Sequence, residues 1–281
     1  MGAPNSGPGA PVVSVVVRVK DEADAIARNL RLLAQQTIAD ATQVVVVDSG
    51  STDGTLGAVR SSEAELVEIP AEDFTYGYSL NVGCERAAAE LTVALSAHAY
   101  PPDEAWLERM VRAFDDPRVA CACGFDLDAA GAPLRGPVVL GTEDFRRHVI
   151  WGYSNSAGGF RTELWREHRF REDMPGSEDK EWAWHWMQRD YVTLIDPALS
   201  SDHDHSDETL REKYDRKRRD WEGIAMFMDL PRYGPREVLG EWWRERAGWR
   251  SPVKARLSPR RLADLAGAYR GRRAVRRTTA A

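Results

Sequence analysis

The stretch QVVVVDSGSTDGT, residues 43–55, decides the fold class of this chain of 281 residues. Its unbroken valine run is typical of a strand that is buried on both faces of a sheet. The Gly, Ser and Asp residues that follow predict a loop leading into a helix. A similar run, VVSVVVRVK, occupies residues 12–20, and residues 21–36 have the apolar periodicity of a helix. Strand, helix and strand at this spacing predict a βαβ unit.

The alternation of strands and helices continues to about residue 125 and then loosens. Further strands are predicted at LVEIP (66–70), LTVALSA (91–97), VACACGFDLD (119–128) and YVTLIDP (191–197). Between the last two of these we expect glycine-rich loops around residues 152–159 and a tryptophan-rich helix at residues 178–189.

The chain is predicted to have three parts. They are a disordered N-terminus at residues 1–11, one α/β domain at residues 12–206, and a helical, arginine-rich extension at residues 207–281. Basic residues far outnumber acidic ones between residues 244 and 277. We expect these arginines to form a solvated face; the alternatives are peripheral membrane contact, a homodimer interface or an acidic acceptor.

The composition argues against several classes of function. A net charge of −6 disfavours a nucleic-acid-binding protein. The three cysteines, Cys84, Cys121 and Cys123, form neither a disulfide framework nor a structural zinc pattern. No apolar run approaches the ~20 residues of a membrane span, and the start MGAPNSGPGA is unlike a signal peptide. We expect a cytoplasmic protein, with the inner face of the membrane as an alternative location.

Asp48 is predicted to lie where the second strand ends, at the edge where open α/β sheets bind nucleotides. We expect its carboxylate to bond the base or ribose of a nucleotide, with Ser49 beside it. The alternative is that both residues, like Thr52 and Asp53, only cap the turn and the next helix. A dinucleotide-binding fold is disfavoured, because no GxGxxG motif follows the first strand.

A second candidate site joins polar residues at the ends of two other strands. His98 follows the strand at residues 91–97, and the cluster DHDHSD at residues 202–207 follows the last strand. Imidazole and carboxylate groups together suit Mn²⁺ and other first-row divalent ions. In an extended segment His203 and His205 point to the same side. We therefore expect a metal site here; the alternatives are a satisfied core histidine and a solvated polar turn.

The third candidate site is MPGSEDKEWAWHW, residues 174–186. Ser177 is expected to cap a helix whose first turn carries Glu178 and Asp179, near partly positive backbone N–H groups. An aspartate oriented in this way suits a general base, although both acids could simply complement the helix dipole. Most tryptophans on such a helix belong to the core, but Trp182 is a candidate for stacking on a sugar.

The fourth stretch is WGYSNSAGGFRTELW, residues 151–165. Its small residues let the backbone approach a ligand closely, and the Asn155 amide can both donate and accept hydrogen bonds. Any glycine-rich turn has this composition, so Asn155 alone does not define a site.

Taken in order, these segments resemble an inverting family 2 glycosyltransferase of the GT-A fold, in a rhamnosyltransferase-like subgroup. The matching segments cover about residues 12–214: VVVRVKDEADAI, VVVVDSGSTDGT, FTYGYSLNVGCERA, SAHAYPPDEAWLERM, YSNSAGGFRTELW, PGSEDKEWAWHW and DHDHSDETLREKY. The resemblance implies an α/β, GT-A (Rossmann-like) fold, in which helices flank a mostly parallel sheet, with a C-terminal helical extension.

The resemblance also implies a role for His98. In this family a DxD motif ends the fourth strand, and its last acid binds the divalent ion that bridges the two phosphates of the sugar donor. Here Ser96 and His98 occupy the acidic positions, which implies a histidine variant of the motif, closed by His203 or His205. Because negative charge is lost, Mn²⁺ is favoured over Mg²⁺. Direct bonding of His98 to the diphosphate, without a metal, is the alternative.

By the same resemblance, Asp179, paired with Glu178, is the base that accepts the proton of the acceptor hydroxyl. The implied nucleotide and donor site comprises Arg18, Asp48, Ser49, Asn81, Ser96 and Asn155, and the implied acceptor site comprises Trp151, Tyr153 and Trp182. We expect transfer of a sugar, with inversion, from a UDP- or dTDP-linked donor to a hydroxyl of a small molecule or glycan. The alternatives are a degenerate GT-A module that binds nucleotide sugar without turnover, and a nucleotidyltransferase.

Overall fold

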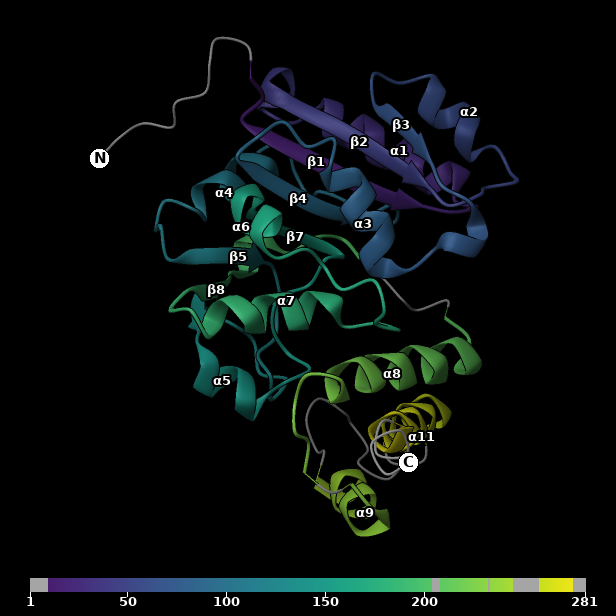
Figure 1. Ribbon diagram of the computed structural model, residues 1–281, viewed down its shortest axis with the longest axis vertical. Helices are drawn as coiled ribbons and strands as arrows, with labels where there is room; N and C mark the ends of the chain where they lie inside the picture. The colour runs from purple at the N-terminus through teal and green to yellow at the C-terminus, as the bar shows by residue number, and fades with distance from the viewer. Residues whose placement is uncertain (1–9, 204–207, 232, 245–257, 275–281) are drawn as a thin grey trace.

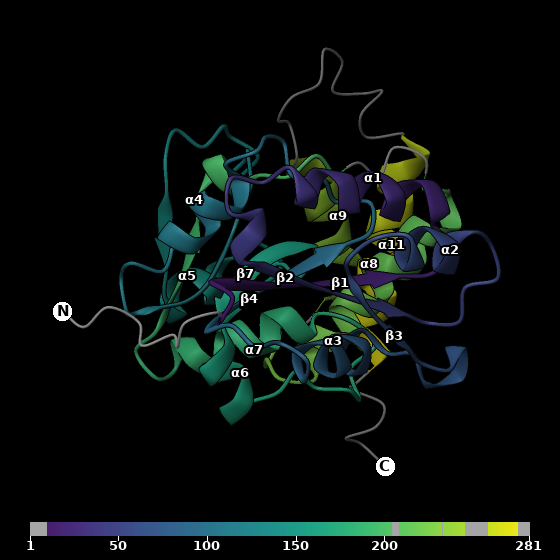
Figure 2. The ribbon, with the colours of Figure 1, turned by 90° about the horizontal axis from the view of Figure 1, so that it is seen from above.

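The computed structural model describes residues 10–203, 208–231, 233–244 and 258–274, so most of the segment predicted to be disordered lies outside it. These residues form an eight-stranded sheet of order β3-β2-β1-β4-β7-β5-β8-β6 with helices on both faces (Figures 1 and 2). The strands are β1 (Val13–Val19), β2 (Thr42–Asp48), β3 (Glu65–Glu68), β4 (Leu91–Ser96), β5 (Val119–Cys123), β6 (Val138–Leu140), β7 (Ala157–Arg161) and β8 (Val192–Ile195). The helices are α1 (Ala23–Ala34), α2 (Thr55–Arg60), α3 (Tyr76–Cys84), α4 (Trp106–Arg112), α5 (Thr142–Arg147), α6 (Thr162–Glu167), α7 (Glu178–Met187), α8 (Leu210–Ala225), α9 (Pro235–Arg244) and α11 (Pro259–Ala274).

The first half of the sheet has the predicted parallel arrangement. β3, β2, β1 and β4 all run parallel, so their carboxyl ends lie at one edge. In this register Arg18 of β1 lies beside Ser96 of β4, and Val19 of β1 lies beside Asp48 of β2. Residues that are distant in the chain therefore meet at the edge where ligands bind in open α/β sheets.

Helices cover both faces of the sheet, which explains why its central strands are almost wholly apolar (Figure 2). One face packs against α1 and α4, and Val15 and Val17 belong to this core. The other face packs against α3, α6 and α7, and Val16 belongs to that core. A two-sided core is expected of a parallel sheet, and polar groups are then accommodated at the strand ends.

Residues 152–159, for which the sequence predicts loops, lead into a central strand. β7 contains Gly158 and Gly159 and runs antiparallel between β4 and β5. A Cβ on Gly158 would overlap the carbonyl oxygen of Ser154, and one on Gly159 would crowd Met110 of α4. Close packing therefore requires glycine in this strand, although glycine within a sequence more often indicates a turn. β5 also ends earlier than predicted, and β6 has no counterpart in the prediction.

The C-terminal helices pack beneath the sheet and α7 (Figure 1). Gly223 of α8 lies directly against the carbonyl group of Gly176, in the turn that precedes α7. Gly267 and Gly271 of α11 lie equally close to the backbone of α8, where any side chain would overlap it. Glycine thus allows backbone-to-backbone contact at both interfaces. None of the helices in the described ranges is both long enough and apolar enough to cross a membrane.

We predict that Gly223→Ala destabilises the protein, because its methyl group would overlap the Gly176 carbonyl. Overpacking of this kind lowers the free energy of unfolding by about 1–3 kcal/mol, which urea denaturation measures. Gly57→Ala is the matched control, since Gly57 also lies in a helix but has open space at its Cβ position. There alanine is expected to stabilise by up to about 1 kcal/mol. Equal stability of the two variants would contradict the described packing of α8.

Candidate active site

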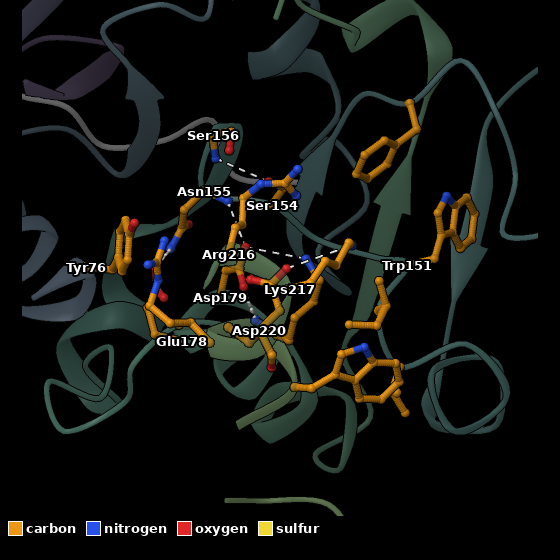
Figure 3. A pocket seen from close by; sticks show the side chains of 18 of the residues that line it. Tyr76, Trp151, Ser154, Asn155, Ser156, Glu178, Asp179, Arg216, Lys217 and Asp220 are labelled. Carbon is orange, nitrogen blue, oxygen red and sulfur yellow. Dashed lines mark hydrogen bonds and ion pairs between the residues drawn. The ribbon is translucent and has the colours of Figure 1, made fainter. Parts of the chain in front are cut away.

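A cavity of about 840 Å³ lies at the carboxyl edge of the parallel strands (Figure 3). Its walls come from the end of β1, the loop after β4, the segment before β7, the start of α7, α8 and α11. The volume is within the range of ~300–1,000 Å³ that is common for small-molecule sites. Segments that are far apart in the sequence thus surround one space.

The cavity brings together eight of the residues predicted for the site: Arg18, Ser96, His98, Trp151, Asn155, Glu178, Asp179 and His203. Five others do not line it: Asp48, Ser49, Asn81, Tyr153 and Trp182. The last, His205, lies outside the described residues. The predicted metal position and the predicted base therefore face the same cavity.

The first turn of α7 presents two adjacent carboxyl groups, those of Glu178 and Asp179. Ser177 does not cap this helix as predicted: its φ is 61°, and its Oγ donates a hydrogen bond to the carbonyl oxygen of Asp220 at 3.1 Å. This left-handed conformation is uncommon for a residue other than glycine. The contact with α8 supports it and sets the direction in which α7 begins.

Asp179 is oriented by hydrogen-bond donors from two segments. Its Oδ2 accepts from the backbone N–H of Asn155 at 3.2 Å, and its Oδ1 accepts from the backbone N–H of Lys180 at 2.7 Å. The Nζ of Lys180 lies 3.4 Å from Oδ2 and also donates to the carbonyl oxygen of Tyr153. These contacts hold the carboxylate at the cavity wall and offset part of its charge.

Glu178 lies in a different environment, although it is the neighbouring residue. It is only 5% exposed, the Arg18 guanidinium lies 3.8 Å from its Oε1, and the Asn155 amide donates to it at 3.5 Å. Burial, and then the adjacent Asp179 charge, raise the pKa of Glu178 to about 7, against the opposing effect of Arg18. Its surroundings thus favour the protonated form of Glu178.

His98 is oriented by a residue that the sequence analysis did not single out. Its Nδ1 lies 2.6 Å from Oε1 of Glu22, which immediately precedes α1. Since a carboxylate only accepts hydrogen bonds, Nδ1 carries the proton and Nε2 is the nitrogen suited to a ligand. The buried Asn29 of α1 supports the same loop, because its amide donates to the carbonyl oxygens of Ser96, Ala97 and Ala99.

The imidazoles of His98 and His203 approach each other at the cavity, with ring centroids 4.9 Å apart. Two imidazoles, one of them fixed by a carboxylate, suit a first-row divalent ion. Within the described residues, no group of three or more His, Cys, Asp or Glu side chains has metal-binding geometry. Two imidazoles alone do not complete the coordination of such an ion, so any ion held here would need further donors.

Asp48 and Ser49 lie beside the cavity rather than on its wall. Oδ1 of Asp48 accepts from the backbone N–H groups of Gly50 and Ser51, both at 2.9 Å, and Ser49 Oγ donates to the Val19 carbonyl at 3.3 Å. Both residues thus hold the turn, which is the alternative raised from the sequence. Oδ2 of Asp48 is buried and receives no hydrogen bond in the described part of the chain.

Three predicted ligand contacts do not fit the structure, since these side chains are enclosed elsewhere. Trp182 and Tyr153 are fully buried, and Trp182 Nε1 donates to the His168 carbonyl at 2.6 Å, so neither ring offers a face to an acceptor. Asn81 connects α3 to later segments, because its amide bonds Trp165 and Phe170. Aromatic and amide residues at such positions look the same in a sequence whether they pack or bind.

Several residues of the cavity wall were missed from the sequence. One of them is Tyr76, whose carbonyl oxygen accepts a hydrogen bond from Arg18 at 3.2 Å. The Arg18 guanidinium lies 5.6 Å from the centre of the Tyr76 ring. Arg216, Lys217 and Asp220 of α8 lie across from Asp179 (Figure 3). Tyr76 lies in FTYGYSLNVGCERA, one of the segments that carry the family resemblance. The residues of α8 had no distinguishing signal, because charged residues along a helix are typical of a solvated face.

Comparison with known proteins agrees with the fold. Residues 14–138 match the family described as Glycosyl transferase family 2. Glycosyltransferase AglE of Haloferax volcanii is 35% identical over 106 residues, which is 36% of this chain and 34% of AglE. The chain thus spans about a third of the length of that relative.

Two solved structures show the same architecture over nearly the whole chain. The mannosyltransferase PcManGT from Pyrobaculum calidifontis, in complex with GDP-Man and Mn²⁺, superposes with a TM-score of 0.68 at 22% identity and covers 96% of this chain and 87% of its own. S. aureus TarS 1–349 in complex with UDP gives a TM-score of 0.55 at 16% identity over 95% of this chain and 91% of its own. The fold is therefore GT-A, and residues 14–138 match glycosyltransferase family 2.

We predict that Glu178→Gln changes how stability depends on pH. The folded carboxyl has a pKa of about 7, raised from an ordinary value of 4.5. Between these values the folded protein holds a proton that the unfolded chain has released, so the free energy of unfolding of the wild type falls as pH rises through this window. Glutamine does not titrate, so the variant should gain stability relative to the wild type between pH 5 and pH 8, by about 1 kcal/mol or more.

Urea unfolding at the two pH values measures this difference. The same substitution at the exposed Glu63 serves as the control, and its stability relative to the wild type should not change in this way. A difference between Glu178→Gln and the wild type that is constant over the whole range would rule out the raised pKa.

Proposed function

We propose that the protein is an inverting glycosyltransferase that moves a sugar from a nucleoside-diphosphate donor to a hydroxyl of a small molecule or glycan. The observation that carries the proposal is the convergence of Asp179 with His98 and His203 on one cavity at the strand ends. The GT-A fold supports it, as does the presence of GDP-Man, UDP or UDP-GlcNAc in structures of the same fold.

The donor would lie along the carboxyl ends of β1, β2 and β4. Asp48 would hold the turn beside the nucleoside through its Oδ1, and Arg18 and Ser96 would face the phosphates. His98 and His203 would hold a divalent ion, with Mn²⁺ preferred, and Glu22 would orient His98 for this purpose. When bound, such an ion supplies positive charge that stabilises the departing diphosphate.

Asp179 would act as the general base. The acceptor oxygen would form a bond to the anomeric carbon and transfer its proton to the Asp179 carboxylate, while the bond to the nucleoside diphosphate breaks on the opposite face. Asn155 and Lys180 would keep the carboxylate oriented throughout. Glu178, protonated or paired with Arg18, would shape the site without competing for the acceptor proton.

Substitution of the base separates catalysis from binding. We predict that Asp179→Asn lowers turnover by about 10²–10⁴-fold, which is the usual contribution of a general base, and leaves nucleotide affinity unchanged. Thermal-shift titration with UDP, dTDP and GDP, with and without Mn²⁺, measures binding, and release of nucleoside diphosphate from a panel of nucleotide sugars measures turnover. Asp24→Asn is the control, because Asp24 is an exposed acid in the first turn of α1.

Two results would oppose this assignment. Full turnover in Asp179→Asn would exclude Asp179 as the base. No stabilisation of the wild type by any of the nucleotides would exclude the proposed reaction altogether.

The metal role of His98 has its own test. We predict that His98→Ala weakens Mn²⁺ binding by about tenfold or more, the loss expected on removing one ligand or its support. Mn²⁺ affinity is measured by titration calorimetry in the presence of UDP and without any acceptor, so the readout does not depend on activity. His185→Ala is the control, since His185 is not part of the cavity wall. If the Mn²⁺ affinity of His98→Ala equals that of the wild type, His98 does not hold the ion.

A further inference from the structure

Four cationic side chains of the C-terminal helices line the cavity: Arg216, Lys217 and Arg219 of α8 and Arg272 of α11. We call this set the cationic wall. Figure 3 shows its members Arg216 and Lys217, with Asp220, close to Asp179. Neither the glycosyltransferase segment at residues 14–138 nor the motifs recognised in the sequence include the wall.

We propose that the cationic wall binds an oxyanion, a phosphate or a carboxylate, carried by the acceptor. The proposal rests on the proposed function, because it takes Asp179 as the base that faces the acceptor hydroxyl. Groups close to the base are then groups close to the acceptor.

The charges of the wall are only partly balanced within the protein. Arg216 makes two hydrogen bonds to Glu208, both at 2.8 Å, and Nζ of Lys217 lies 3.9 Å from Oδ2 of Asp220. Arg219 has no ion-pair partner among the residues that the structure describes. Among the described side chains that line the cavity, cations outnumber acids: Arg18, Arg147, Lys180 and the four of the wall against Asp128, Glu178, Asp179 and Asp220. An anion in the cavity would improve this balance.

Aromatic contacts position the guanidinium of Arg272 in the cationic wall. Its guanidinium lies 3.4 Å from the ring centroid of Trp221 and 4.1 Å from that of Tyr233. Contact with two rings restrains the guanidinium, and a restrained planar donor set suits a two-oxygen contact with phosphate or carboxylate.

Burial of the cationic wall favours the binding of an anionic ligand. Desolvation lowers the pKa of Lys217 against the opposing effect of Asp220, and it raises the pKa of Asp220 against the opposing effects of Lys217 and Arg216, so these charged groups are poorly solvated. An anion that enters such a poorly solvated site interacts more strongly than it would on an open surface.

Two other anions could bind the cationic wall: the headgroups of a membrane surface and the diphosphate of the donor. The position of the wall argues against both. The side chains of Arg216 and Lys217 are only 30% and 24% exposed and line a cavity, whereas a membrane-binding surface presents its cations outward. The diphosphate of the donor is proposed to lie at His98 and Arg18. The wall instead belongs to α8, whose Asp220 is within electrostatic reach of Asp179 and Lys180.

The test uses the full chain, saturated with Mn²⁺ and the nucleoside diphosphate that stabilises it most, so that the donor position is filled. Titration calorimetry measures the binding of glucose 6-phosphate and glucuronate, with glucose as their neutral counterpart. The variant is Arg219→Gln. Its matched control is Arg211→Gln, which removes the same charge from the same helix at a side chain that is 92% exposed.

We expect the wild type and Arg211→Gln to bind at least one of the two anionic sugars in preference to glucose. Arg219→Gln should bind that anion about tenfold more weakly, the loss expected for one charge-assisted hydrogen bond, with nucleotide affinity unchanged. Preference for the phosphate or for the carboxylate identifies which oxyanion the acceptor carries.

The proposal would be overturned if the wild type bound neither anionic sugar in preference to glucose, or if Arg219→Gln bound the anion as tightly as the wild type. It would also be overturned if Arg219→Gln lost nucleotide affinity as much as anion affinity, because the wall would then belong to the donor site. Arg219-dependent binding to phosphatidylglycerol vesicles but to neither sugar would overturn it in favour of a membrane surface. Failure of the proposed function is recognised by a different result, namely that no nucleotide stabilises the protein. In that case the sugars can still be titrated against the protein without nucleotide.

Discussion

The contact between α8 and the turn before α7 determines where the proposed catalytic groups of this protein can lie. Gly223 lies against the carbonyl of Gly176, and the carbonyl of Asp220 accepts a hydrogen bond from Ser177, whose φ is 61°. A side chain at Gly223 would push the two segments apart, and Ser177 would lose the contact that supports its left-handed conformation. The direction of α7, and with it the position of Asp179, therefore depends on a helix that lies outside the matched family segment.

This turn leads into α7, whose first two residues, Glu178 and Asp179, carry carboxyl groups in different environments. Asp179 faces the cavity with N–H donors from Asn155 and Lys180, whereas Glu178 is buried beside Arg18 and has a raised pKa. Neighbouring acids with different environments can divide their roles, one as a base and one as a structural or neutral group. Across the cavity, Glu22 orients His98 in the same manner, so each proposed functional side chain is positioned by a partner that does not belong to its own motif.

The parts of the fold that follow from local pattern were predictable. The valine runs of β1 and β2 and the periodicity of α1 required only the local sequence, because burial on both faces selects a continuous apolar strand. β7 was not predictable in this way, since Gly158 and Gly159 are needed by packing against Ser154 and Met110 rather than by any intrinsic preference. For the same reason Trp182 and Asn81, which resembled ligand contacts, belong to the packed interior.

The sequence by itself determined the α/β class, the resemblance to family 2 glycosyltransferases and eight of the residues that line the cavity, because ligand-binding side chains follow strand ends at spacings that the chain records directly. Only the tertiary structure decided which side chains meet: Glu22 with His98, α8 with the turn at Ser177, and the cationic wall with Asp179. These contacts join segments that are far apart in the chain, and their strength comes from burial and distance. A linear pattern records neither quantity, since a charged residue on a helix has the same letter whether it faces solvent or a cavity.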